Sequence, residues 1–162
     1  MSLAMSINAA PATNTTTTDT SAHTPTPRLP SEPLHSPDPR GPICNFPNGP
    51  SHALQPLVRL NIAALYRRGD APCTASPGPG KCTRVACDLG SAIWLCNDRD
   101  AETSAPCRVV GDYATIILDR CGFYDQARDE ELVEGRLYDT SGPYGDVGPG
   151  WGNVVVGYDL GC

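Results

Sequence analysis

The chain has 162 residues, a formal net charge of −6 at pH 7 and a pI of about 4.9. This length gives room for one ordinary domain. An acidic chain repels phosphate backbones, so we expect no nucleic-acid partner. No apolar run approaches the roughly 18 residues of a membrane span, so we expect no span either.

Residues 1–43 are predicted to be a disordered tail rich in serine, threonine and proline. They contain no aromatic residue and no cysteine, so they bury too little apolar surface to offset the entropy lost on ordering. The run "AAPA" at residues 9–12 is similar to the end of a signal peptide, and the tail can be the remnant of a signal or pro-segment. Asn14, followed by two threonines, matches the N-glycosylation pattern.

All eight cysteines lie in residues 44–162, the predicted folded module. No CxxC motif occurs, and all three histidines precede Cys73, so the pattern does not favour a zinc site. The even count predicts four disulfides and an oxidising compartment, hence a secreted protein. Residues 1–12 have no basic start and only a short apolar run, so the true start lies upstream, export is unconventional, or the protein is not exported. We favour a missing or misassigned start. Eight cysteines allow on the order of 100 pairings, so spacing leaves the connectivity open. The candidates are Cys44, Cys73, Cys82, Cys87, Cys96, Cys107, Cys121 and Cys162.

The first predicted element is a helix within residues 52–69, "HALQPLVRLNIAALYRRG". Its apolar stripe is expected at Leu57, Leu60 and Ala64 with Leu65 one step round. Val58, Ile62 and Tyr66 are expected to flank it. Proline in the first turn and Gly69 after the last turn suit the two ends of a helix.

Arg67 and Arg68 at the end of this helix have three interpretations. They can close the helix, where positive charge complements the helix C-terminus, or form a processing-protease site, or supply the arginine of an adhesive Arg-Gly-Asp tripeptide ending at Asp70. We rank helix closure first, because it also explains Gly69, processing second and adhesion third. If Cys44 bonds into the module, a cut after Arg68 would not release the first helix.

A kinked loop at residues 71–82 is followed by two predicted strands, residues 83–88 and 91–98, which form a hairpin around Leu89-Gly90. In the second strand Ile93 and Leu95 point one way, while Trp94 and Cys96 point the other. Both faces are therefore expected to be covered, with Trp94 in the core.

A second helix is predicted within residues 104–122, with Pro106 in its first turn and Gly122 at its end. Its apolar stripe comprises Val109, Tyr113, Ile116 and Ile117. The charged run 128–134 is expected to be a solvated loop or helix face. Two late strands, residues 135–139 and 153–160, enclose the glycine-rich loop 140–152. Elements in this order predict an α+β fold in which two helices pack on a small antiparallel sheet, stabilised by disulfides.

Several pieces of this module resemble small secreted cysteine-rich proteins of fungi. The matching runs are "CTRVACDLGSAIWLCND", "CRVVGDYATIILDRC", "VEGRLYDT", "NVVVGYD" and the terminal cysteine. The layout is more distantly similar to the killer toxins of smut fungi, which fold as an α/β sandwich. The resemblance implies export, a disulfide-held α+β module and action on another organism or cell surface. It also implies a Cys87–Cys162 bridge. A Cys96–Cys107 bridge, which would close a loop of local span, is ranked above the other pairings.

Catalysis needs a constellation of groups, and the module offers few. No histidine follows His52, and paired cysteines leave no thiolate nucleophile. A pair of carboxylates can run glycoside hydrolysis if one lies in an apolar pocket, or oxygen ligands can hold calcium, although no EF-hand spacing occurs. We expect no catalytic residue, no metal and no cofactor. The carboxylates at predicted strand ends or loops are Asp98, Asp100, Asp139, Asp146 and Asp159.

The glycine-rich loop lacks the GK[ST] ending of a P-loop and leads into a strand, so it is not predicted to bind phosphate. Tyr144, Asp146 and Trp151 in this loop are candidate binding residues, because loops on rigid scaffolds often carry function and Tyr and Trp make good anchors. We therefore expect a secreted fungal effector-like protein that binds an unknown protein or cell-surface target of a host or competitor, without catalysis, and contributes to virulence. A killer-toxin-like antimicrobial is the alternative, and a small carboxylate-dependent hydrolase is the third.

Overall fold

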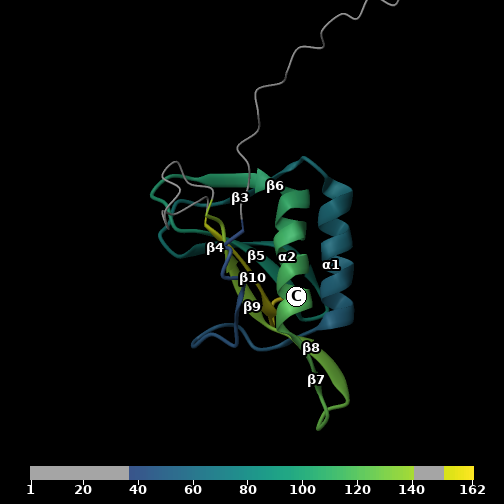
Figure 1. Ribbon diagram of the computed structural model, residues 1–162. Helices are drawn as coiled ribbons and strands as arrows, with labels where there is room; N and C mark the ends of the chain where they lie inside the picture. The colour runs from purple at the N-terminus through teal and green to yellow at the C-terminus, as the bar shows by residue number, and fades with distance from the viewer. Residues whose placement is uncertain (1–36, 141–151) are drawn as a thin grey trace, which may run out of the picture. The chain divides into compact units, whose positions relative to one another are not determined.

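The computed structural model describes residues 37–140 and 152–162. The chain divides into two units, residues 1–31 and 32–162, and every structural statement below concerns described residues of the second unit. These residues contain two helices and ten strands, most of which are labelled in Figure 1.

The largest sheet has five antiparallel strands in the order β1-β9-β10-β5-β4. The expected hairpin is present as β4 and β5, and the two expected late strands are β9 and β10. The last strand of the chain therefore lies in the middle of the sheet. The strands are β1 (Ile43–Cys44), β4 (Lys81–Asp88), β5 (Ser91–Asn97), β9 (Gly135–Tyr138) and β10 (Asn153–Tyr158).

Two smaller antiparallel sheets contain strands that the sequence did not reveal, β2-β8-β7 and β3-β6. The expectation of a loop or helix face at residues 128–134 is wrong for Glu130–Val133, because Leu132 and Val133 are buried in a strand. The remaining strands are β2 (Ala53–Leu54), β3 (Pro72–Ala75), β6 (Thr103–Pro106), β7 (Gly122–Asp125) and β8 (Glu130–Val133).

Two helices, α1 (Gln55–Arg68) and α2 (Cys107–Cys121), lie side by side on one face of the five-stranded sheet (Figure 1). The hydrophobic core lies between the helices and this face. The α+β class with antiparallel strands, two helices and disulfides is confirmed, although the strands form three sheets instead of one. The central core residues are Val58, Ile62, Leu65, Ile93, Leu95, Val110, Ala114, Ile117, Leu137, Val154 and Val156.

The predicted stripe of α1 is correct for Leu65 and wrong for Leu60, because the buried side of the helix is centred on the flanking residues. Leu60 is 57% exposed, whereas Val58, Ile62 and Leu65 are buried. The buried stripe also contains Asn61, whose Nδ2 donates to the Ser91 carbonyl over 2.8 Å. A buried amide needs such a partner, and its polar character concealed the true core-facing side.

The end of α1 agrees with helix closure. Gly69 has a φ of 57°, which favours glycine, and its N–H reaches the carbonyl oxygens of Leu65 and Tyr66 at 3.3 and 3.0 Å. Nη1 of Arg68 donates to the Val85 carbonyl over 2.9 Å. Processing after Arg68 stays a prediction.

The second helix starts one residue later than expected. Pro106 lies at the position before α2 and belongs to β6, so it is not in the first helical turn. The predicted stripe is otherwise correct, since Val109, Tyr113 and Ile117 are buried and Ile116 is partly buried.

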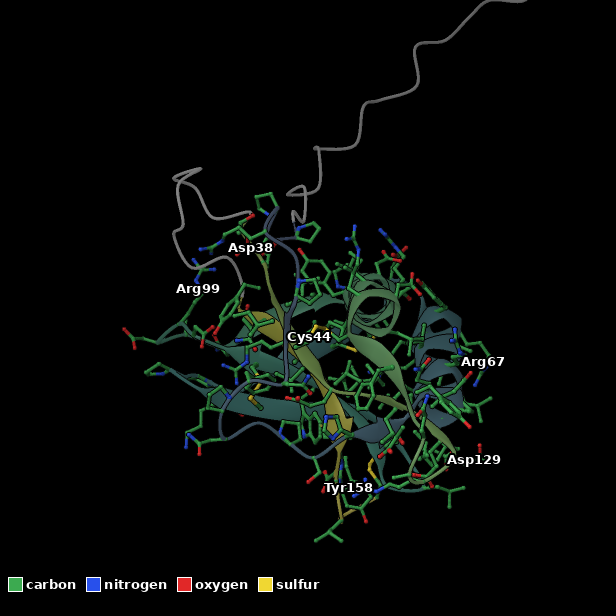
Figure 2. All side chains as sticks on the ribbon, turned by 60° about the horizontal axis from the view of Figure 1, so that its bottom comes forward. Asp38, Cys44, Arg67, Arg99, Asp129 and Tyr158 are labelled. Atoms are coloured by element: carbon green, nitrogen blue, oxygen red, sulfur yellow. A yellow bond between two sulfur atoms is a disulfide. The ribbon has the colours of Figure 1, made fainter. Side chains whose placement is uncertain are left out.

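Four disulfides use all eight cysteines: Cys44–Cys121, Cys73–Cys107, Cys82–Cys96 and Cys87–Cys162. They appear as yellow bonds in Figure 2. The implied Cys87–Cys162 bridge is therefore present. The expected Cys96–Cys107 bridge is wrong, because Cys96 lies opposite Cys82 in the β4–β5 register, while β3 brings Cys73 to the start of α2.

Contacts with the main sheet begin before Cys44. Pro37 forms a β-bridge with Asp139, and the N–H of Asp38 donates to the Tyr138 carbonyl over 2.9 Å. The first bridge, Cys44–Cys121, then fixes the end of β1 against the end of α2. Both contacts hold the segment that follows, residues 45–50, near the sheet.

Candidate functional site

The sheet face turned away from the helices carries the candidate site, and we refer to it as the distal face. Alternation along the strands places Ile93 and Leu95 toward the helices and Trp94 away from them. Cross-strand pairing puts Trp94, Val155 and Arg136 in one row over β5, β10 and β9. Residues from three strands therefore present their side chains together on the distal face.

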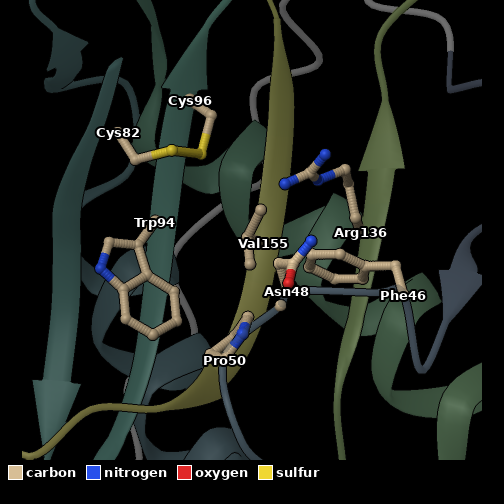
Figure 3. Close-up of a pocket in the computed structure, with 9 residues that line it drawn as sticks. Phe46, Asn48, Pro50, Cys82, Trp94, Cys96, Arg136 and Val155 are labelled. Carbon is tan, nitrogen blue, oxygen red and sulfur yellow. A yellow bond between two sulfur atoms is a disulfide. The ribbon is translucent and has the colours of Figure 1, made fainter. Parts of the chain in front are cut away.

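A pocket of about 180 Å³ lies over this row. Figure 3 shows Val155 in the middle, Trp94 and the Cys82–Cys96 disulfide on one side of it, and Arg136 and Phe46 on the other. Residues 46–50 supply the remaining wall as they cross the distal face. The lining residues are Phe46, Asn48, Gly49, Pro50, Cys82, Trp94, Cys96, Arg136 and Val155.

The wall at residues 46–50 lies directly on the sheet, and Gly157 makes this approach possible. A Cβ atom on Gly157 would stand 2.3 Å from Cγ of Pro50. The neighbouring backbone is joined as well, since the N–H of Tyr158 donates to the Ser51 carbonyl over 2.6 Å. The shape of the pocket therefore depends on a glycine at position 157.

Replacing Gly157 by alanine is expected to push Pro50 off the sheet and to cost about 1–3 kcal/mol in the free energy of unfolding, as overpacking does. Denaturant unfolding measures the cost, and the fluorescence of Trp94 reports the altered pocket. Gly161→Ala is the matched control, because its Cβ would meet only the ends of two side chains, Nη1 of Arg84 at 3.0 Å and Oδ1 of Asp159 at 3.2 Å. Equal effects of the two changes would contradict this account of the wall.

Arg136 is the charged group of the pocket. Its guanidinium carbon lies 4.4 Å from the Phe46 ring centroid and 5.9 Å from that of Tyr138, and Nη1 donates to the Tyr138 hydroxyl over 3.2 Å. Cation–π contacts of this kind stabilise a partly desolvated guanidinium. Its Nε is buried and has no hydrogen-bond partner among the described residues.

Glu134 supports the pocket wall from below. It is 4% exposed, and its carboxylate accepts hydrogen bonds from the backbone N–H groups of Asn45 and Phe46. Burial raises the pKa of Glu134 above its ordinary value, although the charge of His52, these hydrogen bonds and Arg136 act in the opposite direction. Its Oε1 has no partner within the described part of the chain.

The raised pKa of Glu134 makes a pH-dependent contribution to stability. The folded protein keeps this proton at a pH where the unfolded chain has lost it, so the contribution is present below the ordinary pKa of 4.5 and is lost as pH rises through the folded pKa. We therefore expect the free energy of unfolding of wild type minus that of Glu134→Gln to decrease from pH 4.5 upward and then level off. Glu131→Gln, at an exposed position of the same strand, is the matched variant against which this difference is compared. A difference for Glu134→Gln that increases with pH would contradict the assignment.

The candidate carboxylates do not form a facing pair among the described residues. Asp98 accepts a hydrogen bond from Asn153 over 2.9 Å, on the distal side. Asp139 is 3% exposed and accepts from the Tyr113 hydroxyl over 2.7 Å, on the helix side. Burial, and next this hydrogen bond, raise the pKa of Tyr113. The sheet thus separates the two carboxylates that flank β10.

The other acidic candidates lie elsewhere. Asp100 is exposed, and Asp159 at the opposite end of β10 pairs with Arg84 at 2.8 Å. Hydrogen bonds from the Gly161 N–H and from Arg84 lower the pKa of Asp159. Asp159 also lies close to the sulfur atoms of Cys87 and Cys162, but those sulfurs are bonded to each other. They therefore offer no thiolate to a metal ion.

Four sequence candidates, Asn14, Tyr144, Asp146 and Trp151, lie outside the described residues. The expectation that Trp94 belongs to the core is wrong, since it is partly exposed and lines the pocket. Arg136 and Phe46 were missed, and only the alternation of β9 hinted that Arg136 faces away from Leu137.

A second hollow, of about 320 Å³, lies between the β4–β5 turn and the β7–β8 hairpin. Its lining includes Leu89, which is 74% exposed, and Tyr158, which is 40% exposed. Its charged members, Arg128 and Glu130, are at the surface. This hollow lacks a buried polar group that needs a ligand, so the distal pocket is the stronger candidate site.

Comparisons of the chain with protein-family models, with curated proteins and with solved structures found no match. Within the described ranges, neither helix is long and apolar enough to cross a bilayer. The disulfides and the distal pocket are therefore the features of the chain that bear on its function.

Proposed function

We propose that this chain is a secreted effector-like protein that binds a component of a host or competitor and catalyses no reaction. Four disulfides are typical of extracellular proteins. The resemblance to fungal cysteine-rich proteins supports a fungal origin and a contribution to virulence. A small module crosslinked by four disulfides is a rigid scaffold on which a binding surface can be presented.

The distal pocket is the observation that carries the proposal. It combines a partly exposed tryptophan, a proline and a phenylalanine with an arginine that has a buried and unpaired Nε. Pockets with mostly apolar walls and one placed polar group are typical binding sites. The pocket lies on antiparallel strands that the Cys82–Cys96 bridge joins, so little ordering entropy is lost when a ligand binds.

Secretion is tested by mass spectrometry of the protein recovered from culture fluid of the organism that produces it. The expected product contains residues 44–162, has no free thiol and reports any sugar on Asn14 and any cut after Arg68. Recovery only from within the cells would overturn the proposal.

The binding role is tested by gene deletion and complementation. Deletion is expected to reduce virulence without a growth defect, and wild type but not Trp94→Ala should restore it. Arg120→Gln, at an exposed position in the last turn of α2, is the control and should restore virulence. Full restoration by Trp94→Ala would contradict a role for the pocket. Growth inhibition of competitor fungi by the purified protein would favour the killer-toxin alternative instead.

A further inference from the structure

The distal pocket is open to solvent on one side, so its volume sets the size of the part of a ligand that it can enclose. An apolar cavity of about 150 Å³ in another protein binds benzene, and drug-sized ligands occupy roughly 300–1,000 Å³. At about 180 Å³, the pocket has room for one ring with a small substituent. An oligosaccharide or a folded protein element would not be enclosed by it.

The positive charge of Arg136 favours a ligand that carries a negative charge. No described carboxylate forms an ion pair with Arg136: the arginines in described ion pairs are Arg40, Arg84, Arg108 and Arg128. Glu134 is nearby but accepts its hydrogen bonds from Asn45 and Phe46. Glu134 therefore acts on Arg136 only through space, and the half-buried guanidinium has no ion-pair partner among the described residues. A ligand carboxylate can supply one, because it can accept two parallel N–H bonds from an arginine.

The row of side chains sets the distance between the two ends of the ligand. Trp94 and Arg136 lie on strands that flank β10, so their backbones are about 10 Å apart at the usual strand spacing. Val155 forms the floor between them, and Pro50 and Phe46 close the side (Figure 3). A flat ring can pack on Val155 beside Trp94 while an attached carboxylate reaches the guanidinium.

We propose that the distal pocket binds a small aromatic carboxylic acid with a single ring, whose carboxylate pairs with Arg136 and whose ring packs against Trp94 and Pro50. The proposal deepens the proposed function and rests on it for its biological meaning. The ligand class itself follows from the volume, the unpaired cation and the aromatic wall, and it can be tested on the purified protein alone.

The test is a titration of the full disulfide-bonded chain with phenylacetate and benzoate, followed by amide chemical shifts and calorimetry. We expect saturable binding with shifts that cluster at Phe46, Trp94 and Arg136. Acetate should bind at least tenfold more weakly, because it lacks the ring. Phenethyl alcohol should also bind at least tenfold more weakly, because it lacks the charge.

Variants separate charge from shape. Arg136→Gln should weaken phenylacetate binding at least tenfold and leave the weak binding of phenethyl alcohol unchanged, whereas Trp94→Ala should weaken both. Arg136→Lys retains the charge but not the planar fork, so an intermediate loss is expected, and it serves in place of Arg136→Gln if that variant does not fold. Arg84→Gln is the matched control: Arg84 lies in the same row, next to Trp94, but is paired with Asp159, so binding should change less than twofold.

Three outcomes would overturn the ligand class: no saturable binding of either acid, equal binding of phenylacetate and phenethyl alcohol, or phenylacetate binding that survives Arg136→Gln. None of these outcomes would contradict the proposed function, because that function is tested by secretion and by the failure of Trp94→Ala to restore virulence. If the acids do not bind and Trp94→Ala still fails to restore virulence, the pocket is functional and its ligand belongs to another class.

Discussion

Replacing Cys44 and Cys121 together by alanine is expected to lower the free energy of unfolding by about 4 kcal/mol. The bridge joins residues 77 apart in the sequence, and the entropy that a crosslink removes from the unfolded chain grows with the length of the closed loop. The Cys73–Cys107 bridge lies within this loop and shortens the chain that connects Cys44 to Cys121 in the unfolded state. The expected loss of about 4 kcal/mol takes this shortening into account. Denaturant unfolding of the oxidised proteins measures the effect.

The matched comparison is the double replacement of Cys82 and Cys96, whose separation is only 14 residues. The same reasoning predicts a loss of about 3 kcal/mol there. The two double variants should also differ in binding, because Cys44 anchors residues 45–50, while Cys82 and Cys96 only line the pocket. A larger loss of stability for the short loop than for the long one would refute the chain-entropy account.

Replacing Leu95 by alanine is expected to cost about 3 kcal/mol in the free energy of unfolding, within the range measured for buried leucines. Leu95 is 0% exposed and lies in β5, between β10 and β4, beneath the two helices. Two paired strands and a cross-strand disulfide hold the backbone here, so the cavity left behind cannot collapse easily. Thermal or denaturant unfolding at constant pH measures the loss.

Leu89→Ala is the control for this experiment. Leu89 belongs to the same hairpin but is 74% exposed, and a surface change of this kind usually stays within about 0.5 kcal/mol. Comparable losses for Leu95 and Leu89 would mean that the helices do not pack on the face that carries Leu95.

Elements with strong local signals were predictable from the sequence. The hairpin of β4 and β5, the apolar strand β10 and the apolar face of α2 each follow from periodicity within one segment. The buried stripe of α1 was not predictable in this way, because apolar residues lie on several sides of the helix and its buried side includes Asn61. The hydrogen bond from Asn61 to Ser91 is a tertiary contact, and no local pattern encodes it.

The short strands and the pocket were beyond prediction for a related reason. β2 and β3 have two and four residues, and they become strands only because β8 and β6 pair with them. The pocket joins Phe46 from an irregular segment, Trp94 from β5 and Arg136 from β9. Sequence alternation showed that Trp94 points away from Ile93, but it gave no means to decide what covers that side.

Side chains alternate between the two faces of the sheet, and this alternation separates substitutions that alter the pocket from substitutions that alter the core. Trp94 and Val155 each stand between neighbours in sequence that point into the core, for example Ile93 and Leu95 around Trp94. Arg136 stands between the buried Leu137 and Gly135, whose Cα faces the core. Substitutions at the three distal positions can therefore alter the ligand while the packing beneath the helices stays intact. A lineage under pressure to follow a changing target would be expected to vary at these positions and in residues 45–50, and to retain the core positions between them.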